Sequence, residues 1–140
     1  MIKIYNSCKN YKIDKKLIKL IVKQLSVELS FKIENLEISF VDKETILQLN
    51  KEYLNHDYFT DILTFDYSET INKLNAEIII CCEIANENAE NNGVTFLNEI
   101  TRLVIHGILH LSGYDDTGEA KKTEMTEKEN ILLKKLLEVE

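Results

Sequence analysis

Residues 95–112, with the sequence TFLNEITRLVIHGILHLS, predict the helix around which the rest of the chain folds. This is the most apolar of the helical segments, so we expect it at the centre of the core. Thr95 and Glu99 are near a capping-box arrangement, although their spacing is one residue longer than in the strict motif. Gly113 follows the segment, and glycine commonly adopts the left-handed conformation in which helices end.

The segments around this helix show strand and helix patterns in turn. Strands are predicted at 2–5, 36–41, 62–67 and 74–82, and helices within 14–31, 43–54, 83–92 and 118–139. Asp14 and Asp42 precede two of these helices as candidate N-caps, and Gly93 follows a third. The segment 74–82 is almost entirely apolar and β-branched, which is typical of a strand buried on both faces.

Together these elements predict an α+β fold with one domain over residues 1–140. We expect a small mixed sheet of about four strands, with helices packed largely on one side and the helix of residues 95–112 in the centre. The last helix is predicted to close the core with one apolar face, which contains Met125, Ile131, Leu132 and Leu136.

The composition is that of an ordinary soluble domain, with 44% hydrophobic and 29% charged residues in 140. The longest apolar run is far shorter than the ~20 residues of a membrane span, so we expect a cytoplasmic protein. The formal net charge of −7 argues against broad, non-specific binding of nucleic acid, but it does not exclude a local basic groove. The cysteines Cys8, Cys81 and Cys82 are predicted to be buried and unpaired.

Two of the three histidines, His106 and His110, lie four residues apart in the central helix. Their side chains therefore project from one face with Cβ atoms about 6 Å apart, which suits two ligands of one tetrahedral metal ion. A turn at Gly113 brings the next residues back toward the histidines. We predict Asp116 as the third metal ligand, and Asp115 behind it or pointing outward.

The same spacing occurs in the metzincin metalloproteases, whose third ligand lies six residues after the second histidine. Those enzymes carry a glutamate directly after the first histidine as general base. Here that position is Gly107. The sequence thus predicts the metal-binding helix without the protease base.

The stretch HGILHLSGYDD, residues 106–116, is similar to the motif His-Gly-x-Leu-His-Leu-x-Gly-Tyr-Asp-His of the YbeY endoribonucleases. Residues 49–65, LNKEYLNHDYFTDILTF, resemble a second motif of that family at Leu49, Asn50, Tyr53, Asp57, Thr60, Asp61, Leu63 and Phe65. The resemblance covers essentially the whole chain. It implies a single-strand-specific, metal-dependent endoribonuclease in 16S rRNA 3′-end maturation and ribosome biogenesis, with one Zn²⁺ and with the rRNA precursor and the small ribosomal subunit as partners.

The departures from the family pattern concern the proposed site. Asp116 stands where the family has its third histidine, Leu54 where it has an arginine and His56 where it has a lysine. The only arginine of the chain is Arg102, one turn before His106 on the same face. Either Arg102 extends over the metal cleft and replaces the missing cation, or it is a solvated or glutamate-paired arginine of the helix.

The mechanism expected from these residues is metal-assisted hydrolysis of RNA, with His106, His110 and Asp116 as metal ligands. Arg102 and His56 are the candidate catalytic groups. Asp57 and Asp61, together with Asp115, are expected near the metal or along the cleft. Two alternatives remain open at this point: a zinc-dependent protease or amidase, and a ribosome-maturation factor whose metal is structural.

Overall fold

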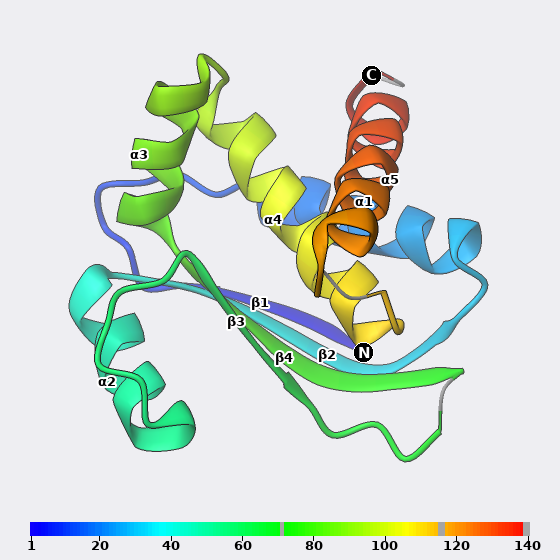
Figure 1. The fold of residues 1–140 in the computed structure, drawn as a ribbon, viewed down its shortest axis with the longest axis horizontal. Coiled ribbons are helices and arrows are strands. Elements are labelled where there is room, and N and C mark those ends of the chain that lie inside the picture. The colour runs from blue at the N-terminus through cyan, green and yellow to red at the C-terminus, as the bar shows by residue number, and fades with distance from the viewer. Residues whose placement is uncertain (71, 115–116, 139–140) are drawn as a thin grey trace.

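The structure is a computed structural model that describes residues 1–70, 72–114 and 117–138 (Figure 1). Its sheet has the strand order β1-β2-β4-β3. Strands β1 (Ile2–Asn6), β2 (Lys32–Val41) and β4 (Lys73–Cys81) run parallel, and β3 (Ile62–Asp66) pairs antiparallel with β4 at one edge. The predicted small mixed sheet is therefore confirmed.

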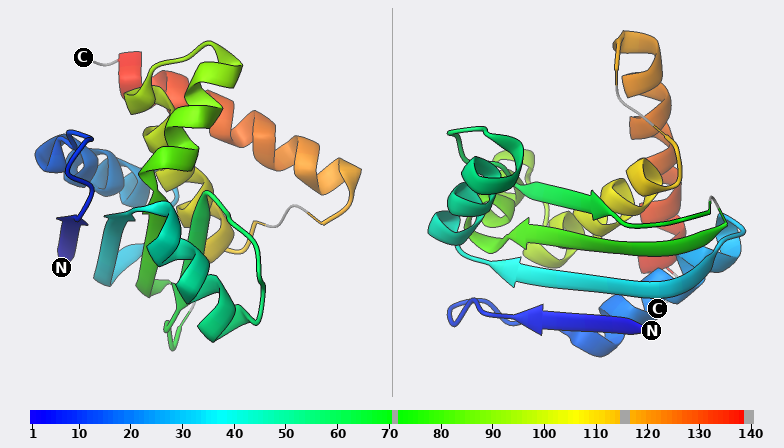
Figure 2. Two further views of the ribbon diagram at one scale, coloured as in Figure 1. Left: turned by 90° about the vertical axis from the view of Figure 1, so that its left-hand side faces the viewer. Right: turned by 90° about the horizontal axis from the view of Figure 1, so that it is seen from below.

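The helices cover the two faces of the sheet unequally (Figures 1 and 2). Helices α1 (Lys15–Glu28), α3 (Cys82–Asn92), α4 (Phe96–Leu111) and α5 (Glu119–Glu138) lie on one side, and α2 (Lys43–Leu54) lies on the other. The expectation of helices largely on one side is confirmed. Across the described ranges, the helices include none that combines the length and the apolar character needed to cross a membrane.

The predicted helix boundaries follow from local hydrogen bonds. The side chain of Asp14 accepts a hydrogen bond from the backbone N–H of Leu17 at 3.1 Å, and Asp42 caps α2 in the same way. Thr95 caps α4 by accepting from the N–H of Asn98 at 3.0 Å. Glu99, which follows Thr95 at nearly capping-box spacing, instead accepts hydrogen bonds from Arg102.

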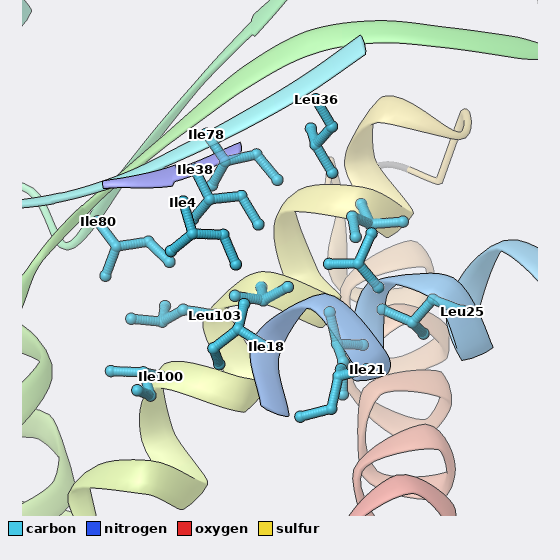
Figure 3. Packing of buried hydrophobic residues seen from close by; sticks show 14 of the residues in the cluster. Ile4, Ile18, Ile21, Leu25, Leu36, Ile38, Ile78, Ile80, Ile100 and Leu103 are labelled. Atoms are coloured by element: carbon cyan, nitrogen blue, oxygen red, sulfur yellow. The ribbon is translucent and has the colours of Figure 1, made fainter. Parts of the chain in front are cut away.

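The core lies between the sheet and helices α1, α4 and α5 (Figure 3). A Cβ atom added to Gly107 would lie 3.1 Å from Ile62 Cδ1 and 3.2 Å from Ile78 Cδ1. Because a larger residue does not fit there without displacing these side chains, Gly107 lets α4 approach β3 and β4 closely. This close approach sets the position of His106 beside the β3 edge of the sheet.

Helix α5 corrects one prediction about the core. Met125, Leu132 and Leu136 are buried as expected, but Ile131 is 62% exposed. The buried face of α5 instead contains Glu129, which is 4% exposed. Residues 125, 129, 132 and 136 recur at intervals of three and four, so they form one helical face that leaves Ile131 outside it.

Candidate metal centre on helix α4

His106 and His110 lie on consecutive turns of α4, near the C-terminal end of the helix. The His106 side chain is 28% exposed and His110 is exposed. Gly113 has a φ of +103° directly after the helix. The N–H of Gly113 donates to the carbonyl of His110, and the N–H of Tyr114 donates to the carbonyl of Leu109 at 3.0 Å, which is the Schellman pattern. The predicted end of the helix at Gly113 is confirmed, while the return of residues 115 and 116 toward the histidines lies outside the described residues.

The ring of His106 is held by a carboxylate from another helix. Its Nδ1 lies 2.5 Å from Oε2 of Glu129, on α5. An ionised carboxylate only accepts hydrogen bonds, so this contact places a proton on Nδ1 and the lone pair of the neutral ring on Nε2. Carboxylate–histidine pairs of this kind are the usual support of metal-ligating histidines, because they fix both tautomer and ring orientation.

Glu129 was not among the predicted site residues. The only sequence signal for it is a charged residue on the otherwise apolar face of α5, four residues after Met125 and three before Leu132. A carboxylate that is almost fully buried needs a partner. That requirement indicates a polar contact in the core, but it does not identify His106 as the partner.

Arg102 connects Glu129 to a second buried carboxylate. The guanidinium donates to both carboxylate oxygens of Glu99, from Nε to Oε1 at 2.9 Å and from Nη2 to Oε2. Its Nη1 donates to Oε1 of Glu129 at 3.2 Å. The hydrogen bonds that Arg102 donates to Glu99 raise the pKa of Arg102, in opposition to its burial. The structure thus has the glutamate-paired arginine of the two alternatives above, and a catalytic role for Arg102 stays a prediction.

Glu99, Arg102, Glu129 and His106 form one cluster on the histidine face of α4, in which the two glutamates are buried and Arg102 and His106 are partly exposed. Glu99 is 1% exposed, so both carboxylates are removed from water. With two carboxylates and one guanidinium, the cluster has an excess of one negative charge next to His106. An excess negative charge of low solvent exposure favours a cation at the histidines.

A complete ligand set is not visible in the described residues. Among them no group of three His, Cys, Asp or Glu side chains is arranged to hold a metal ion. Asp115 and Asp116 lie outside the described residues. Helix α4 therefore supplies two histidines with the support expected of metal ligands, and the third ligand stays a prediction.

Four positions singled out in the sequence lie in or next to the loop between α2 and β3, residues 55–61. They are His56, Asp57 and Asp61 in the loop and Leu54 directly before it. His56 is exposed, and its Nδ1 lies 2.9 Å from the hydroxyl of Tyr58, with the two rings stacked. Asp57 is 79% exposed and pairs with Lys51 at 3.1 Å. Leu54, at the position of the family arginine, is exposed as well.

Asp61 is the loop residue that the structure brings close to the histidine helix. Its Oδ2 accepts a hydrogen bond from Asn88 of α3 at 3.2 Å. Burial raises the pKa of Asp61, while the nearby positive charge of Arg102 acts in the opposite direction. The strand β3 that follows Asp61 packs against α4, so the position of this carboxylate is fixed by the sheet.

Open space borders the turn that follows His110. A hollow of about 330 Å³ lies between this turn and the β3–β4 connection, and Asp66 and Ser68 contribute to its wall. A second hollow of about 340 Å³ lies between the same turn and the start of α5. Ser112 and Gly113 line both. Among the described residues that line these two hollows, neither His106 nor His110 is present, so the hollows adjoin the end of α4 and not the histidine rings.

Comparisons with known proteins agree with this architecture. The family model described as Endoribonuclease YbeY matches residues 3–137. A protein named Endoribonuclease YbeY from Chlorobium phaeobacteroides is 34% identical over 136 residues, which are 97% of this chain and 94% of the relative. The protein of that name from Bacteroides thetaiotaomicron is 37% identical over 109 residues, 78% of this chain and 79% of the relative.

The Endoribonuclease YbeY of Parabacteroides distasonis is 44% identical over 91 residues, which are 65% of this chain and 63% of that protein. Among solved structures, the solution structure of a Thermotoga maritima protein matches with a TM-score of 0.67 and 30% identity, covering 97% of this chain and 89% of the other. The sequence motifs, the fold and these matches, which extend over nearly all of residues 1–140, lead to one conclusion: the chain belongs to the YbeY endoribonuclease family.

Proposed function

We propose that this protein is a metal-dependent endoribonuclease that cleaves single-stranded RNA during 16S rRNA 3′-end maturation, acting on the small ribosomal subunit in the cytoplasm. Its chemistry is hydrolysis of a phosphodiester bond. The observation that carries the proposal is the buried pairing of His106 with Glu129 one turn from His110, because it prepares a histidine for a metal in a chain of this family.

The proposed metal ligands are His106, His110 and Asp116, and the proposed ion is Zn²⁺. Two imidazoles and one carboxylate are an ordinary ligand set for a catalytic zinc, which keeps one position open. When bound, such an ion polarises the scissile phosphate and lowers the pKa of the attacking water. Glu129 contributes by holding the proton on His106 Nδ1, and Arg102 contributes by holding Glu129 in place.

The roles of the remaining site residues follow from their positions. Asp61 is fixed beside Arg102 and His106, so we assign it to the wall of the cleft. His56 and Asp57 are on the open loop, where they reach RNA only after it has bound along that surface. We keep Arg102 and His56 as the candidate catalytic groups for stabilising the phosphate.

Neither alternative function is supported. A protease or amidase of the metzincin type needs a glutamate in place of Gly107, and the contacts of Gly107 with Ile62 and Ile78 show that a side chain at this position faces the sheet rather than the histidines. The curated relatives are named endoribonucleases. A binding factor with a structural metal has no observation in its favour.

The first experiment measures zinc stoichiometry and cleavage of an unstructured RNA in parallel. We expect one Zn²⁺ per chain and cleavage that a chelator abolishes and zinc restores. His110→Gln is expected to lose both, since glutamine is a poor zinc ligand. His56→Ala is the matched control for loss of a histidine and is expected to keep its zinc. Wild-type protein that cleaves RNA equally well without metal would contradict the proposal.

The second experiment places the activity in the cell. A deletion strain is complemented with wild type, His110→Gln or Arg102→Lys, and the 3′ ends of 16S rRNA are mapped. Wild type is expected to restore mature ends and His110→Gln is not. Full rescue by a folded His110→Gln protein would show that the metal is dispensable and would favour the binding factor.

A further inference from the structure

The positive charge of this acidic protein is concentrated at its N-terminal end. The first 27 residues contain seven lysines and one acidic residue, Asp14. The remaining 113 residues contain ten basic and 23 acidic residues. Although the net charge of the whole chain is −7, its N-terminal segment is therefore strongly basic. This segment is folded as β1, the following loop and α1.

Six of these lysines form one exposed surface, which we call the lysine face: Lys9, Lys12, Lys15, Lys16, Lys19 and Lys23. Lys15, Lys19 and Lys23 follow one another at intervals of four along α1 and span about 12 Å of its axis. Lys9 and Lys12 line a shallow surface hollow of about 710 Å³ in the loop before α1. In the part of the chain that the structure describes, none of the six takes part in an ion pair.

The histidine end of the molecule shows the opposite charge pattern. Arg102 is already paired with two buried glutamates, and the family arginine is replaced by Leu54. On the loop side, Lys43 pairs with Glu87 and Lys51 pairs with Asp57. Because each of these three basic side chains has a carboxylate partner, this end of the molecule attracts the backbone of a long RNA less strongly than unpaired lysines do.

We infer that the lysine face is a second RNA-binding surface, which holds the sugar–phosphate backbone of a folded RNA while the histidine end acts on a single-stranded part of it. The inference rests on the proposed function for the identity of the ligand. Helix α1 packs on the β1 side of the sheet and α4 packs on β3 and β4, so the two surfaces lie over opposite edges (Figure 2). Only an RNA large enough to reach both edges contacts both surfaces.

The arrangement favours backbone binding over other partners. Lysines bind phosphates as point charges and read no sequence, as a non-specific anchor requires. An anionic membrane is the competing ligand, because Leu20 and Val27 are exposed on the same helix. RNA is favoured because the lysine face continues from α1 into the loop before it, where Lys9 and Lys12 line a hollow of mixed polar and apolar character together with Asn6, Ser7, Cys8, Tyr11 and Ile13.

The test compares two triple variants that remove equal charge. One is Lys15→Gln/Lys19→Gln/Lys23→Gln. Its matched control is Lys32→Gln/Lys73→Gln/Lys134→Gln, which changes exposed lysines on β2, β4 and α5. Binding of metal-free protein to a labelled, folded 16S rRNA fragment is measured over a range of salt concentrations. Cleavage of a short single-stranded oligonucleotide by the zinc-loaded protein, and binding to phosphatidylglycerol vesicles, are measured beside it.

The α1 variant is expected to bind the folded RNA at least tenfold more weakly and to lose about two to three from the slope of log K against log salt. The control is expected to keep the wild-type slope, and both variants should cleave the short oligonucleotide at the wild-type rate. Equal losses in the two triples, no loss in either, or a loss confined to vesicles would overturn the inference. If wild type does not cleave the oligonucleotide but the α1 variant still loses RNA binding, the lysine face stands and the proposed function fails.

Discussion

Helix α4 and the loop of residues 55–61 both match motifs of the YbeY family, but their side chains differ in how firmly their surroundings hold them. On α4, His106 is fixed by Glu129, and Arg102 is fixed by two carboxylates that are almost fully buried. On the loop, His56 and Asp57 are exposed, and their contacts are with near neighbours in sequence, Tyr58 and Lys51.

The difference separates preorganised groups from groups that need a ligand to order them. A side chain held by buried hydrogen bonds keeps its geometry before substrate arrives, which is how a metal ligand or a charge-stabilising group gains its effect. A side chain on an exposed loop contributes only after binding. We therefore expect substitution of Glu129 to change both stability and metal affinity, and substitutions of His56 and Asp57 to change neither.

The largest effect is expected for Glu129→Ala. Removal of this carboxylate takes one partner from Arg102 and removes the contact with His106 Nδ1, and breaking a buried pair in this way costs about 3–5 kcal/mol of unfolding free energy. Zinc affinity should fall about 10- to 100-fold. Urea denaturation and zinc competition measure the two effects. Glu127→Ala, at an exposed glutamate of the same helix, is the control, and equal behaviour of the two variants would refute a special role for Glu129.

The next largest effect is expected for Gly107→Val, which tests the close approach of α4 to the sheet. The added side chain meets Ile62 and Ile78, and overpacking of this kind costs about 1–3 kcal/mol. Thermal and urea unfolding measure the loss. A variant as stable as wild type would mean that α4 does not depend on a glycine to reach its position.

A smaller and pH-dependent effect is expected for Asp61→Asn in the metal-free protein. Burial raises the pKa of Asp61 in the folded state, so its ionised form disfavours folding. The stability that protonated Asp61 contributes is present below the unfolded pKa, near 3.8, and is lost as the pH rises through the higher folded pKa. The variant should thus be more stable than wild type at pH 7 and lose this advantage in acid. Unfolding curves measured across this pH range test the prediction. A variant that is less stable than wild type at pH 7 would contradict it.

The smallest effect is expected for Asp57→Ala, which removes an ion pair from the loop. The pair with Lys51 is exposed on both sides, and such pairs contribute about 0–1 kcal/mol. Unfolding free energy should change little, and zinc affinity should not change. A loss comparable with that of Glu129→Ala would abolish the distinction between the helix and the loop.

The sequence predicted the features that depend on neighbours along the chain. The caps at Asp14, Asp42 and Thr95, the stop at Gly113 and the four strands all follow from local patterns and are confirmed. The pairing of His106 with Glu129 joins residues 23 positions apart on two helices. Nothing local specifies how α5 packs on α4, so this contact was not predictable.

Two further differences have the same origin. Arg102 and Glu99 are three residues apart on one helix, so the sequence is compatible with an ion pair between them. It is equally compatible with an Arg102 side chain that extends over the metal cleft. Ile131 was assigned to the core because it is apolar, whereas the face of α5 that packs on α4 contains a glutamate instead. In both cases the demand of a buried charge for partners decided the outcome.

The contribution of α5 to the histidine site has a consequence for the order in which the protein matures. Chains are synthesised and begin to fold from the N-terminus, so α4 leaves the ribosome before Glu129 does. Until α5 has docked, the two histidines are present, but the carboxylate that fixes the ring of His106 is absent. The site is thus completed only after residue 129 has left the ribosome and α5 has docked on α4. A nascent chain whose α5 has not yet docked has both histidines of the proposed metal site without the carboxylate that orients one of them.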